Sequence, residues 1–230
     1  MTRISRLAAP SRTLATLPAP RRPARRRIRI VRNLRVLVAA PARSPRCQAD
    51  ARRTAVRLTF LPRVTPLPSR AEPLLVVPAG QADRALGADA DVLYICTHSY
   101  PEPEPWSVLD TDLADLRGVL TARALVLDTC WGAALSVRRA LAAMRPAGLP
   151  PLALLAPAGR APFDHHVLAG PVLEALLTGD GTGPWHQRLA AAKEAALAGA
   201  ELAAHARRDW ARWQIHSVPG TRTVWQEQQA

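Results

Sequence analysis

Apolar residues gather in short blocks along the chain, separated by longer stretches in which apolar and polar positions are mixed. The most continuous blocks lie at 36–40, 91–96, 124–128 and 152–157. Short blocks that are apolar almost throughout predict strands buried on both faces, and such strands are typical of a parallel sheet covered by helices. A last strand is predicted for the sequence WQIHSV at 213–218.

The stretches between these blocks carry apolar residues at helical spacing. Helices are predicted at 113–120, 134–144, 167–177 and 185–210. Two more short strands, 55–62 and 72–78, each end at a proline, which removes a hydrogen-bond donor from the ladder. Strands that alternate with helices predict an α/β domain of three layers, with a mostly parallel sheet of about six strands flanked by helices.

The charge divides the chain into parts. The formal net charge is +13, but residues 1–70 hold 18 arginines and one acid, whereas the remainder holds 13 basic and 17 acidic side chains. The first 27 residues, rich in Pro and Arg, bury too little apolar surface to offset the entropy of ordering. We expect a disordered leader at 1–30, one domain at 31–220 and a tail at 221–230. The leader also has the composition of an organelle transit peptide.

The cysteines and the hydropathy restrict the class of protein. Cys47, Cys96 and Cys130 show no CxxC or Cys/His ligand spacing, which argues against a disulfide framework and a structural zinc site. We therefore expect no metal, no cofactor and a reducing, cytoplasmic location. No apolar run approaches the roughly 18 residues needed to span a bilayer, so no membrane association is predicted.

Two of the predicted strands end in reactive side chains. The strand 91–96 is followed by His98 and Ser99, and the strand 124–128 is followed by Cys130. Ligands of open parallel sheets bind beyond the carboxyl ends of the strands, so these side chains are predicted at the functional edge. The 31 residues between His98 and Cys130 leave room for the crossover that neighbouring parallel strands require. An imidazole and a thiol are thus expected to face one cleft.

A thiol beside an imidazole has the chemistry of a cysteine hydrolase. Cysteine is mostly protonated at neutral pH, and a charged histidine or the amino end of a helix favours its reactive thiolate. A helix is predicted to begin near Ala133, soon after Cys130. Backbone N–H groups around Ser99 and Cys130 are then the expected donors to the oxyanion that forms when a carbonyl is attacked.

The order of these motifs resembles the CHAT domain, a branch of the caspase-like cysteine peptidases related to separases and metacaspases. The resemblance rests on DVLYICTHSY, SVLDTDLADLRGVL and ARALVLDTCWGAA, where the histidine precedes the cysteine by one strand-helix-strand unit. It continues through HHVLAGPVLEALLTGD to WARWQIHSV and covers 74–218. The resemblance implies a three-layer caspase-like fold and an endopeptidase with Cys130 as nucleophile and His98 as general acid for the leaving amine.

The resemblance also implies roles for neighbouring residues and a biological setting. Asp128, two residues before Cys130, would help to line the substrate pocket, where a carboxylate favours cleavage after Arg or Lys. Ser99 would lie at the substrate and oxyanion site. The implied partners are a protein or peptide substrate and a regulatory protein, in regulated proteolysis such as bacterial defence or cell-death signalling.

Other interpretations remain open. Ser99 stands where the family usually has glycine, and Trp131 is bulkier than the family's residue after the cysteine, so a catalytically degenerate module acting through protein-protein interaction is the alternative. The arginines of residues 1–70 favour a further alternative, attachment to nucleic-acid phosphates. Apart from these arginines, no nucleic-acid partner is predicted.

Several residues also have a purely structural interpretation. Cys130 is alternatively a buried apolar residue, and Asp128 alternatively caps a helix or turn. Cys96 is predicted to belong to the core and Cys47 to be an incidental exposed thiol. The doublet His165–His166 has no acid or cysteine at ligand spacing, so it does not predict a metal site.

Overall fold

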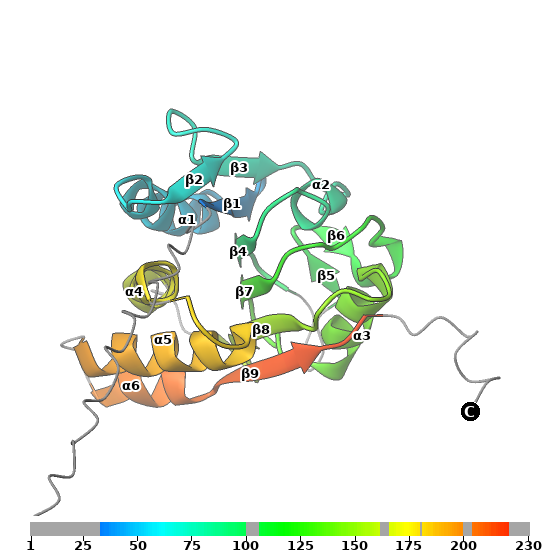
Figure 1. The fold of residues 1–230 in the computed structure, drawn as a ribbon. Helices are drawn as coiled ribbons and strands as arrows, with labels where there is room; N and C mark the ends of the chain where they lie inside the picture. The colour runs from blue at the N-terminus through cyan, green and yellow to red at the C-terminus, as the bar shows by residue number, and fades with distance from the viewer. Residues whose placement is uncertain (1–32, 100–105, 162–165, 180, 200–203, 221–230) are drawn as a thin grey trace, which may run out of the picture. The chain divides into compact units, whose positions relative to one another are not determined.

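The computed structural model describes residues 33–99, 106–161, 166–179, 181–199 and 204–220 (Figure 1). The chain divides into two units, Met1–Val31 and Arg32–Ala230, and all described residues belong to the second. The leader predicted at 1–30 and the tail predicted at 221–230 therefore lie outside the described residues.

The second unit alternates strands and helices. Its strands are β1 (Leu34–Pro41), β2 (Val64–Leu67), β3 (Leu74–Val77), β4 (Val92–Cys96), β5 (Ser107–Val108), β6 (Thr111–Asp112), β7 (Ala124–Asp128), β8 (Leu152–Pro157) and β9 (Trp213–Val218). Its helices are α1 (Pro45–Thr59), α2 (Asp83–Leu86), the single 3-10 turn η1 (Leu113–Asp115), α3 (Leu135–Met144), α4 (His166–Thr178), α5 (Trp185–Gly199) and α6 (Ala204–Ala211).

Among the described strands, seven form one sheet in the order β2-β1-β4-β7-β8-β9, with β3 also paired to β1. The central strands β1, β4, β7 and β8 run parallel, and β9 closes the sheet antiparallel to β8. β2 and β3 pair with the first and second halves of β1 on its other side. These pairings confirm the predicted α/β fold with a mostly parallel sheet flanked by helices.

Helices cover both faces of this sheet (Figure 1). α1, α4, α5 and α6 lie on one face, and α2, α3 and the β5–β6 hairpin lie on the other. Within β4, Tyr94 and Cys96 point into the first core, whereas Leu93 and Ile95 point into the second. Every residue of β4 and β7 is buried, which explains why continuous apolar blocks predicted these strands correctly.

The strand predicted at 55–62 was wrong, because residues up to Thr59 belong to α1. Ser44 caps the amino end of this helix and Pro45 occupies its first turn, so the start signal lies well before the predicted strand. The buried positions of α1 follow the helical period and include Ala51, Ala55 and Leu58. The helical period begins upstream of residue 55. It decides the structure of the segment, although the segment contains β-branched residues, which favour strands.

Two predicted helices also differ from the structure. The segment 113–120 contains only the turn η1, and Gly118 within it has a left-handed φ of 109° that ends any helical repeat. The segment 185–210 contains α5 and most of α6, and residues 200–203 between them lie outside the described residues. β2 was not predicted from the sequence.

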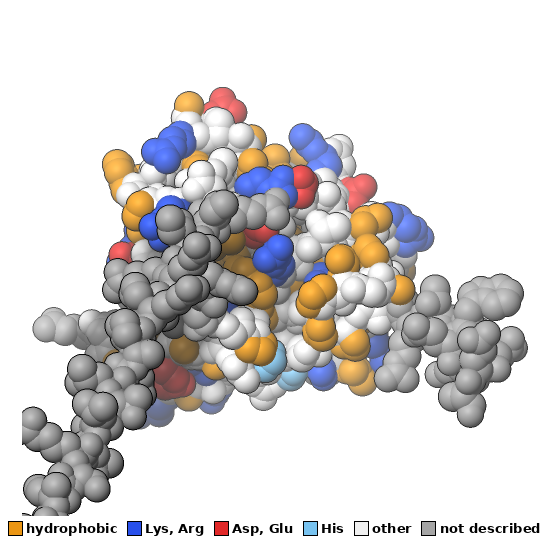
Figure 2. All heavy atoms as spheres, in the orientation of Figure 1, with side chains coloured by type: hydrophobic (Ala, Val, Ile, Leu, Met, Phe, Trp, Pro, Cys, Tyr) orange, Lys and Arg blue, Asp and Glu red, His pale blue; other side chains and the backbone are white. Residues whose placement is uncertain are grey.

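The surface of the described residues is mixed in character. On the face shown in Figure 2, arginine and lysine side chains are dispersed among apolar and acidic ones rather than collected in one patch. No helix in the described ranges is both long enough and apolar enough to cross a membrane.

Candidate functional site

The predicted dyad follows the two central strands β4 and β7. These strands are parallel neighbours, and Cys96 at the end of β4 pairs with Asp128 at the end of β7. The ladder continues one residue further, since the N–H of Thr97 donates to the carbonyl of Asp128 at 2.9 Å. His98 comes two residues after Cys96, and Cys130 comes two residues after Asp128. The sheet therefore carries both of them to the same edge.

Backbone hydrogen bonds hold the turn that contains Cys130. The N–H of Trp131 donates to the carbonyl of Gly159 at 2.7 Å, and the N–H of Ala133 donates to the carbonyl of Pro157 at 2.9 Å. Both acceptors lie at the end of β8 or just beyond it. The turn after β7 is therefore attached to the next strand of the sheet, which fixes the position of the Cys130 backbone.

The same turn is tightly packed and locally strained. Trp131 adopts a φ of 59°, in the left-handed region that non-glycine residues rarely occupy. A Cβ on Gly132 would lie 3.1 Å from the Cβ of Ala156, from the carbonyl oxygen of Leu127 and from Cγ2 of Thr129. Only glycine therefore fits at position 132 without displacing its neighbours. This requirement depends on packing, so it could not be predicted from the sequence.

The thiol of Cys130 is half-buried and has a polar contact with the segment after β8. Its Sγ accepts a hydrogen bond from the N–H of Ala161 at 3.4 Å, so the segment after β8 also reaches the sulfur. The N–H of Cys130 itself donates no hydrogen bond to any residue that the structure describes.

The ring of His98 is half-buried, and Cys47 is the first cause of a shift in its pKa. A hydrogen bond with Cys47 raises the pKa of His98, and the charge of Cys47 and that of Asp110 act in the same direction. Burial and the nearby charge of Arg46 oppose this effect by lowering the pKa of His98. The imidazole is thus held in its protonated form more firmly than a free histidine, by a thiol that was not predicted to be its partner.

Sequence reasoning missed Asp110. Leu109 and Asp110 form the turn of the β5–β6 hairpin, with left-handed φ values of 53° and 55°. The N–H of Leu109 donates to Oγ1 of Thr97 at 3.0 Å, which attaches this turn to the residue before His98. Without an obvious glycine or asparagine in the turn, the sequence contained little signal for a hairpin here.

The prediction for Cys47 was wrong. Cys47 is 3% exposed and lies in the first turn of α1, with its N–H donating to Oγ of Ser44. Hydrogen bonds with Cys96, His98 and Ser44, in that order, lower the pKa of Cys47 against the opposing effect of burial. The Ser44-Pro45 helix start was the available sequence signal, because it places Cys47 at the amino end of a helix.

Asp128 is enclosed rather than exposed at the edge. Its side chain is fully buried, and Oδ2 accepts a hydrogen bond of 3.0 Å from the hydroxyl of Tyr94 on β4. Burial and then the charge of Asp128 raise the pKa of Tyr94 well above its usual value, so the hydroxyl remains a donor. In this structure Asp128 contributes to the packing between two strands, and the role predicted for it in substrate binding remains a prediction.

Ser99 is also used within the protein. Its buried hydroxyl donates to the carbonyl of Cys130 at 2.6 Å and lies 3.1 Å from Oγ1 of Thr129. The segment after β4 is therefore attached directly to the segment after β7. Ser99 thus joins the two segments that carry the predicted dyad, and its contact with a substrate remains a prediction.

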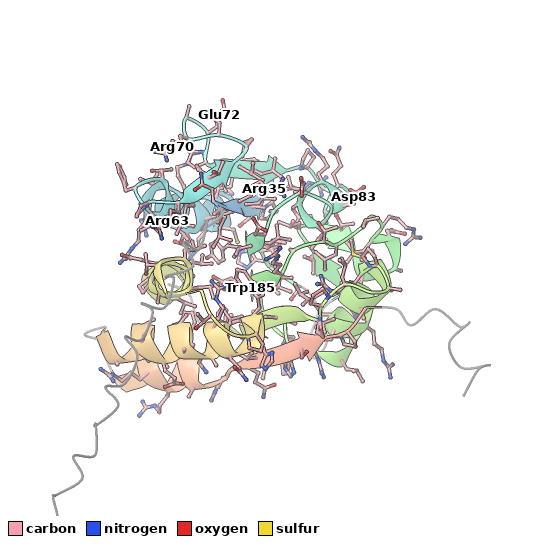
Figure 3. All side chains as sticks on the ribbon, viewed as in Figure 1. Arg35, Arg63, Arg70, Glu72, Asp83 and Trp185 are labelled. Atoms are coloured by element: carbon pink, nitrogen blue, oxygen red, sulfur yellow. The ribbon has the colours of Figure 1, made fainter. Side chains whose placement is uncertain are left out.

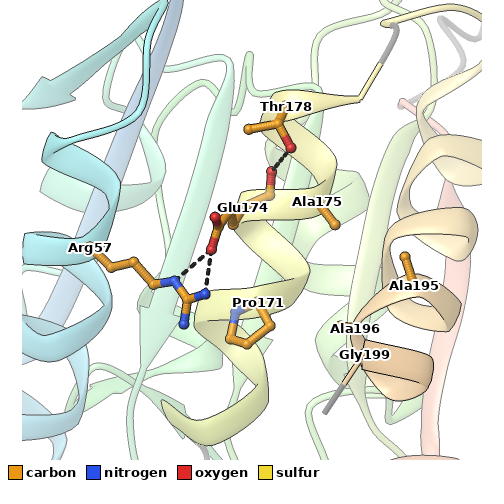
Figure 4. Close-up of a pocket in the computed structure, with 8 residues that line it drawn as sticks. All are labelled: Arg57, Pro171, Glu174, Ala175, Thr178, Ala195, Ala196 and Gly199. Atoms are coloured by element: carbon orange, nitrogen blue, oxygen red, sulfur yellow. Dashed lines mark hydrogen bonds and ion pairs between the residues drawn. The ribbon is translucent and has the colours of Figure 1, made fainter.

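Two hollows are lined by other parts of the chain. One, of about 400 Å³, lies between α1, α4 and α5, where Arg57 pairs with Glu174 (Figure 4). The other, of about 410 Å³, includes Arg35 and Trp185 (Figure 3) and the buried Arg145, which donates to backbone carbonyls. Neither hollow is lined by His98 or Cys130.

No group of three or more His, Cys, Asp or Glu side chains in the described part of the chain is arranged to hold a metal ion. His165 lies outside the described residues, and nothing is described of the side chain of His166.

No family model, curated protein or solved structure matches this chain. A functional interpretation therefore depends on the chemistry and geometry of the residues at the carboxyl edge of β4 and β7.

Proposed function

We propose that the protein is a cysteine peptidase in which Cys130 attacks a peptide carbonyl and His98 protonates the departing amine. The observation that carries the proposal is the pairing of β4 with β7, which puts these residues at equivalent positions beyond adjacent parallel strands. Paired strands lie about 4.8 Å apart, so an imidazole and a thiol that follow them can reach one substrate carbonyl.

Each step of this reaction has a group in the protein to perform it. The Cys130 thiolate forms a bond to the carbonyl carbon, and the N–H of Cys130 is a donor for the resulting oxyanion. The C–N bond then breaks as the amine takes a proton from His98, which leaves an acyl group on the sulfur. Water hydrolyses this thioester, restoring the thiol and releasing the carboxylic acid.

The electrostatics around His98 support its role as the acid. Its pKa is raised, chiefly by the interaction with Cys47, so more of the imidazole is protonated near neutral pH than in free histidine. A general acid needs its proton before the leaving group departs. The interaction with Cys47 supplies this condition without any contribution from Cys130.

The substrate preference is a separate question. The sequence predicted cleavage after Arg or Lys because of Asp128, but this side chain is fully buried against Tyr94. A basic side chain would reach the carboxylate only if these strand ends moved apart. We therefore propose the peptidase without a basic preference and include substrates of both kinds in its test.

The test uses the full chain and two peptide probes that alkylate catalytic thiols, one ending in arginine and one in leucine. We expect labelling at Cys130, located by peptide mapping, and none in Cys130→Ala. The His98→Ala variant should cleave peptides with the same two end residues at least about 100-fold more slowly, the lower range for loss of a general acid or base. His186→Ala, which changes an exposed histidine at the start of α5, is the matched control and should label normally.

A folded wild-type chain that neither probe labels and that cleaves no peptide would support the second candidate, a module that acts through protein partners. The observation favouring this candidate is the hydroxyl of Ser99, which donates to the Cys130 carbonyl at 2.6 Å and occupies the space beside the turn. Equal rates of peptide cleavage by wild type and His98→Ala would instead retain a reactive thiol but remove His98 from the mechanism.

A further inference from the structure

The side of α1 that faces away from the core is strongly basic. The buried residues of this helix lie on one side of it, and the opposite side is exposed. Residues 43–63 contain a single acid, Asp50, and six arginines, all of them exposed: Arg43, Arg46, Arg52, Arg53, Arg57 and Arg63. Arg43 precedes α1, Arg63 (Figure 3) follows it, and the other four belong to it. These six arginines are called the basic face.

Two carboxylates of the described residues offset part of this charge. Asp50 on α1 pairs with Arg53 at 3.6 Å, and Glu174 on α4 accepts a hydrogen bond of 2.6 Å from Nε of Arg57 (Figure 4). Six arginines against these two acids leave an excess of four positive charges. Repulsion among like charges destabilises the free protein, and an anionic partner relieves it. The basic face therefore indicates a partner that carries several negative charges.

An exposed aromatic ring accompanies the arginines. Residues four apart lie on the same side of a helix, so Arg52, Val56 and Phe60 form one row along the exposed side of α1. Phe60, at the carboxyl end of the helix, is 82% exposed, and Val56 is 47% exposed. The ring of Phe60 therefore gains little stabilisation from burial in the core and is accessible to a partner.

We propose that the basic face binds single-stranded nucleic acid without sequence preference. Its arginines contact phosphates, because a planar guanidinium donates two parallel hydrogen bonds to a phosphate. Phe60 stacks on a base, as aromatic side chains beside basic ones do in proteins that bind single strands. The 15 residues of α1 extend about 22 Å, enough to follow several nucleotides. Neither His98 nor Cys130 belongs to this face, so the inference is independent of the proposed peptidase.

The apolar surface of α1 argues against an anionic membrane as the partner. A helix that lies in a membrane interface buries a broad apolar side in the lipid. The apolar side of α1 is packed into the core instead, where Ala51, Ala55 and Leu58 are buried. Val56 and Phe60 leave only a narrow apolar row on the exposed side, which a stacked base can cover.

The test compares full-length chains, so that the arginines of residues 1–32 contribute equally to each. Binding of a fluorescent oligothymidine is measured by anisotropy at several salt concentrations. The face variant combines the changes Arg46→Gln, Arg52→Gln, Arg53→Gln and Arg63→Gln. The control variant loses the same charge at exposed arginines of other segments, through Arg84→Gln, Arg139→Gln, Arg208→Gln and Arg212→Gln.

The expected result is a difference in salt dependence. For a single strand, the logarithm of the association constant falls against the logarithm of the salt concentration with a slope of about −0.7 per phosphate contact. Because the face variant lacks four contacts, wild type should lose about 50-fold more affinity than this variant between about 50 and 200 mM salt. The control variant should keep the salt dependence of wild type.

Two single changes should act in opposite directions. Glu174→Gln removes the carboxylate that pairs with Arg57, so it should strengthen binding of the oligonucleotide. Phe60→Ala removes the stacking ring and should weaken binding of the single strand about 5-fold to 150-fold, with duplex binding unchanged. These two variants decide the question if the face variant fails to fold.

Equal salt dependence of wild type and the face variant would overturn the proposal, because the phosphate contacts would then lie elsewhere in the chain. Unchanged binding by Phe60→Ala would overturn the preference for a single strand. Binding of phosphatidylserine vesicles or of polyglutamate in preference to the oligonucleotide would assign the basic face to a membrane or to an acidic protein, and either result would also overturn the proposal.

Discussion

The hydroxyl of Tyr94 on β4 donates a hydrogen bond of 3.0 Å to Oδ2 of Asp128, the last residue of β7, with both side chains fully buried. The contact joins the two strands that carry the candidate site. Replacement of Tyr94 by phenylalanine leaves the ring but removes the donor. We expect Tyr94→Phe to lower the free energy of unfolding by about 1.5–3 kcal/mol, the range for a hydrogen bond to a charged group. Urea denaturation monitored by circular dichroism measures this change.

Asp128→Asn and the double variant complete a thermodynamic cycle for the same pair. Residues in contact show interaction energies of about 0.5–3 kcal/mol, so the effects of the two single changes should not add. Additive effects in the double variant would show that the hydrogen bond contributes nothing specific and that Tyr94 acts through packing alone.

The hydroxyl of Ser99 attaches the segment after β4 to the carbonyl of Cys130. We expect Ser99→Ala to destabilise the protein by about 0.5–1.5 kcal/mol through loss of this hydrogen bond. Thermal denaturation is the measurement. Ser217→Ala, at an exposed position of β9, is the control and should change the stability by less than about 0.5 kcal/mol. Equal effects of the two changes would remove Ser99 as a connection between the strand ends.

Gly132 and Gly159 differ in the space that surrounds them. A Cβ at Gly132 would meet three atoms at 3.1 Å, whereas a Cβ at Gly159 would have nothing within 4 Å. Gly132→Ala should therefore destabilise the protein by about 1–3 kcal/mol through overpacking. Gly159→Ala should leave stability unchanged or raise it by up to about 1 kcal/mol, because alanine restricts the unfolded chain. Urea denaturation of both variants tests this contrast, and a reversed order would contradict the packing of the turn.

The pKa of His98 should depend on Cys47 more than on Cys130. Cys47 is the main cause of the raised pKa, so Cys47→Ala should lower it and convert more of the ring to the neutral form at pH 7. NMR titration of the imidazole protons measures the pKa directly. Cys130→Ala is the matched change and should shift the pKa less. A larger shift in Cys130→Ala would make Cys130 the principal thiol partner of His98.

The strands of the central sheet could be predicted from sequence because burial on both faces requires apolar residues at every position. The blocks at 91–96 and 124–128 correspond to β4 and β7 within one residue at their amino ends. The segment 55–62 was misassigned for a related reason. A short apolar stretch has no distinct period, and the start signal of α1 at Ser44 lies outside it.

The sequence by itself determined that a histidine and a cysteine follow two buried strands, because hydrophobic periodicity and residue order are local properties of the chain. Only the tertiary structure decided which groups surround them. Cys47 is brought to His98 by the packing of α1 on the sheet, and Asp128 is enclosed by Tyr94 from the neighbouring strand. Such contacts join residues that are distant in sequence, so their geometry and their effect on a pKa arise only when the strands pair and the helix packs.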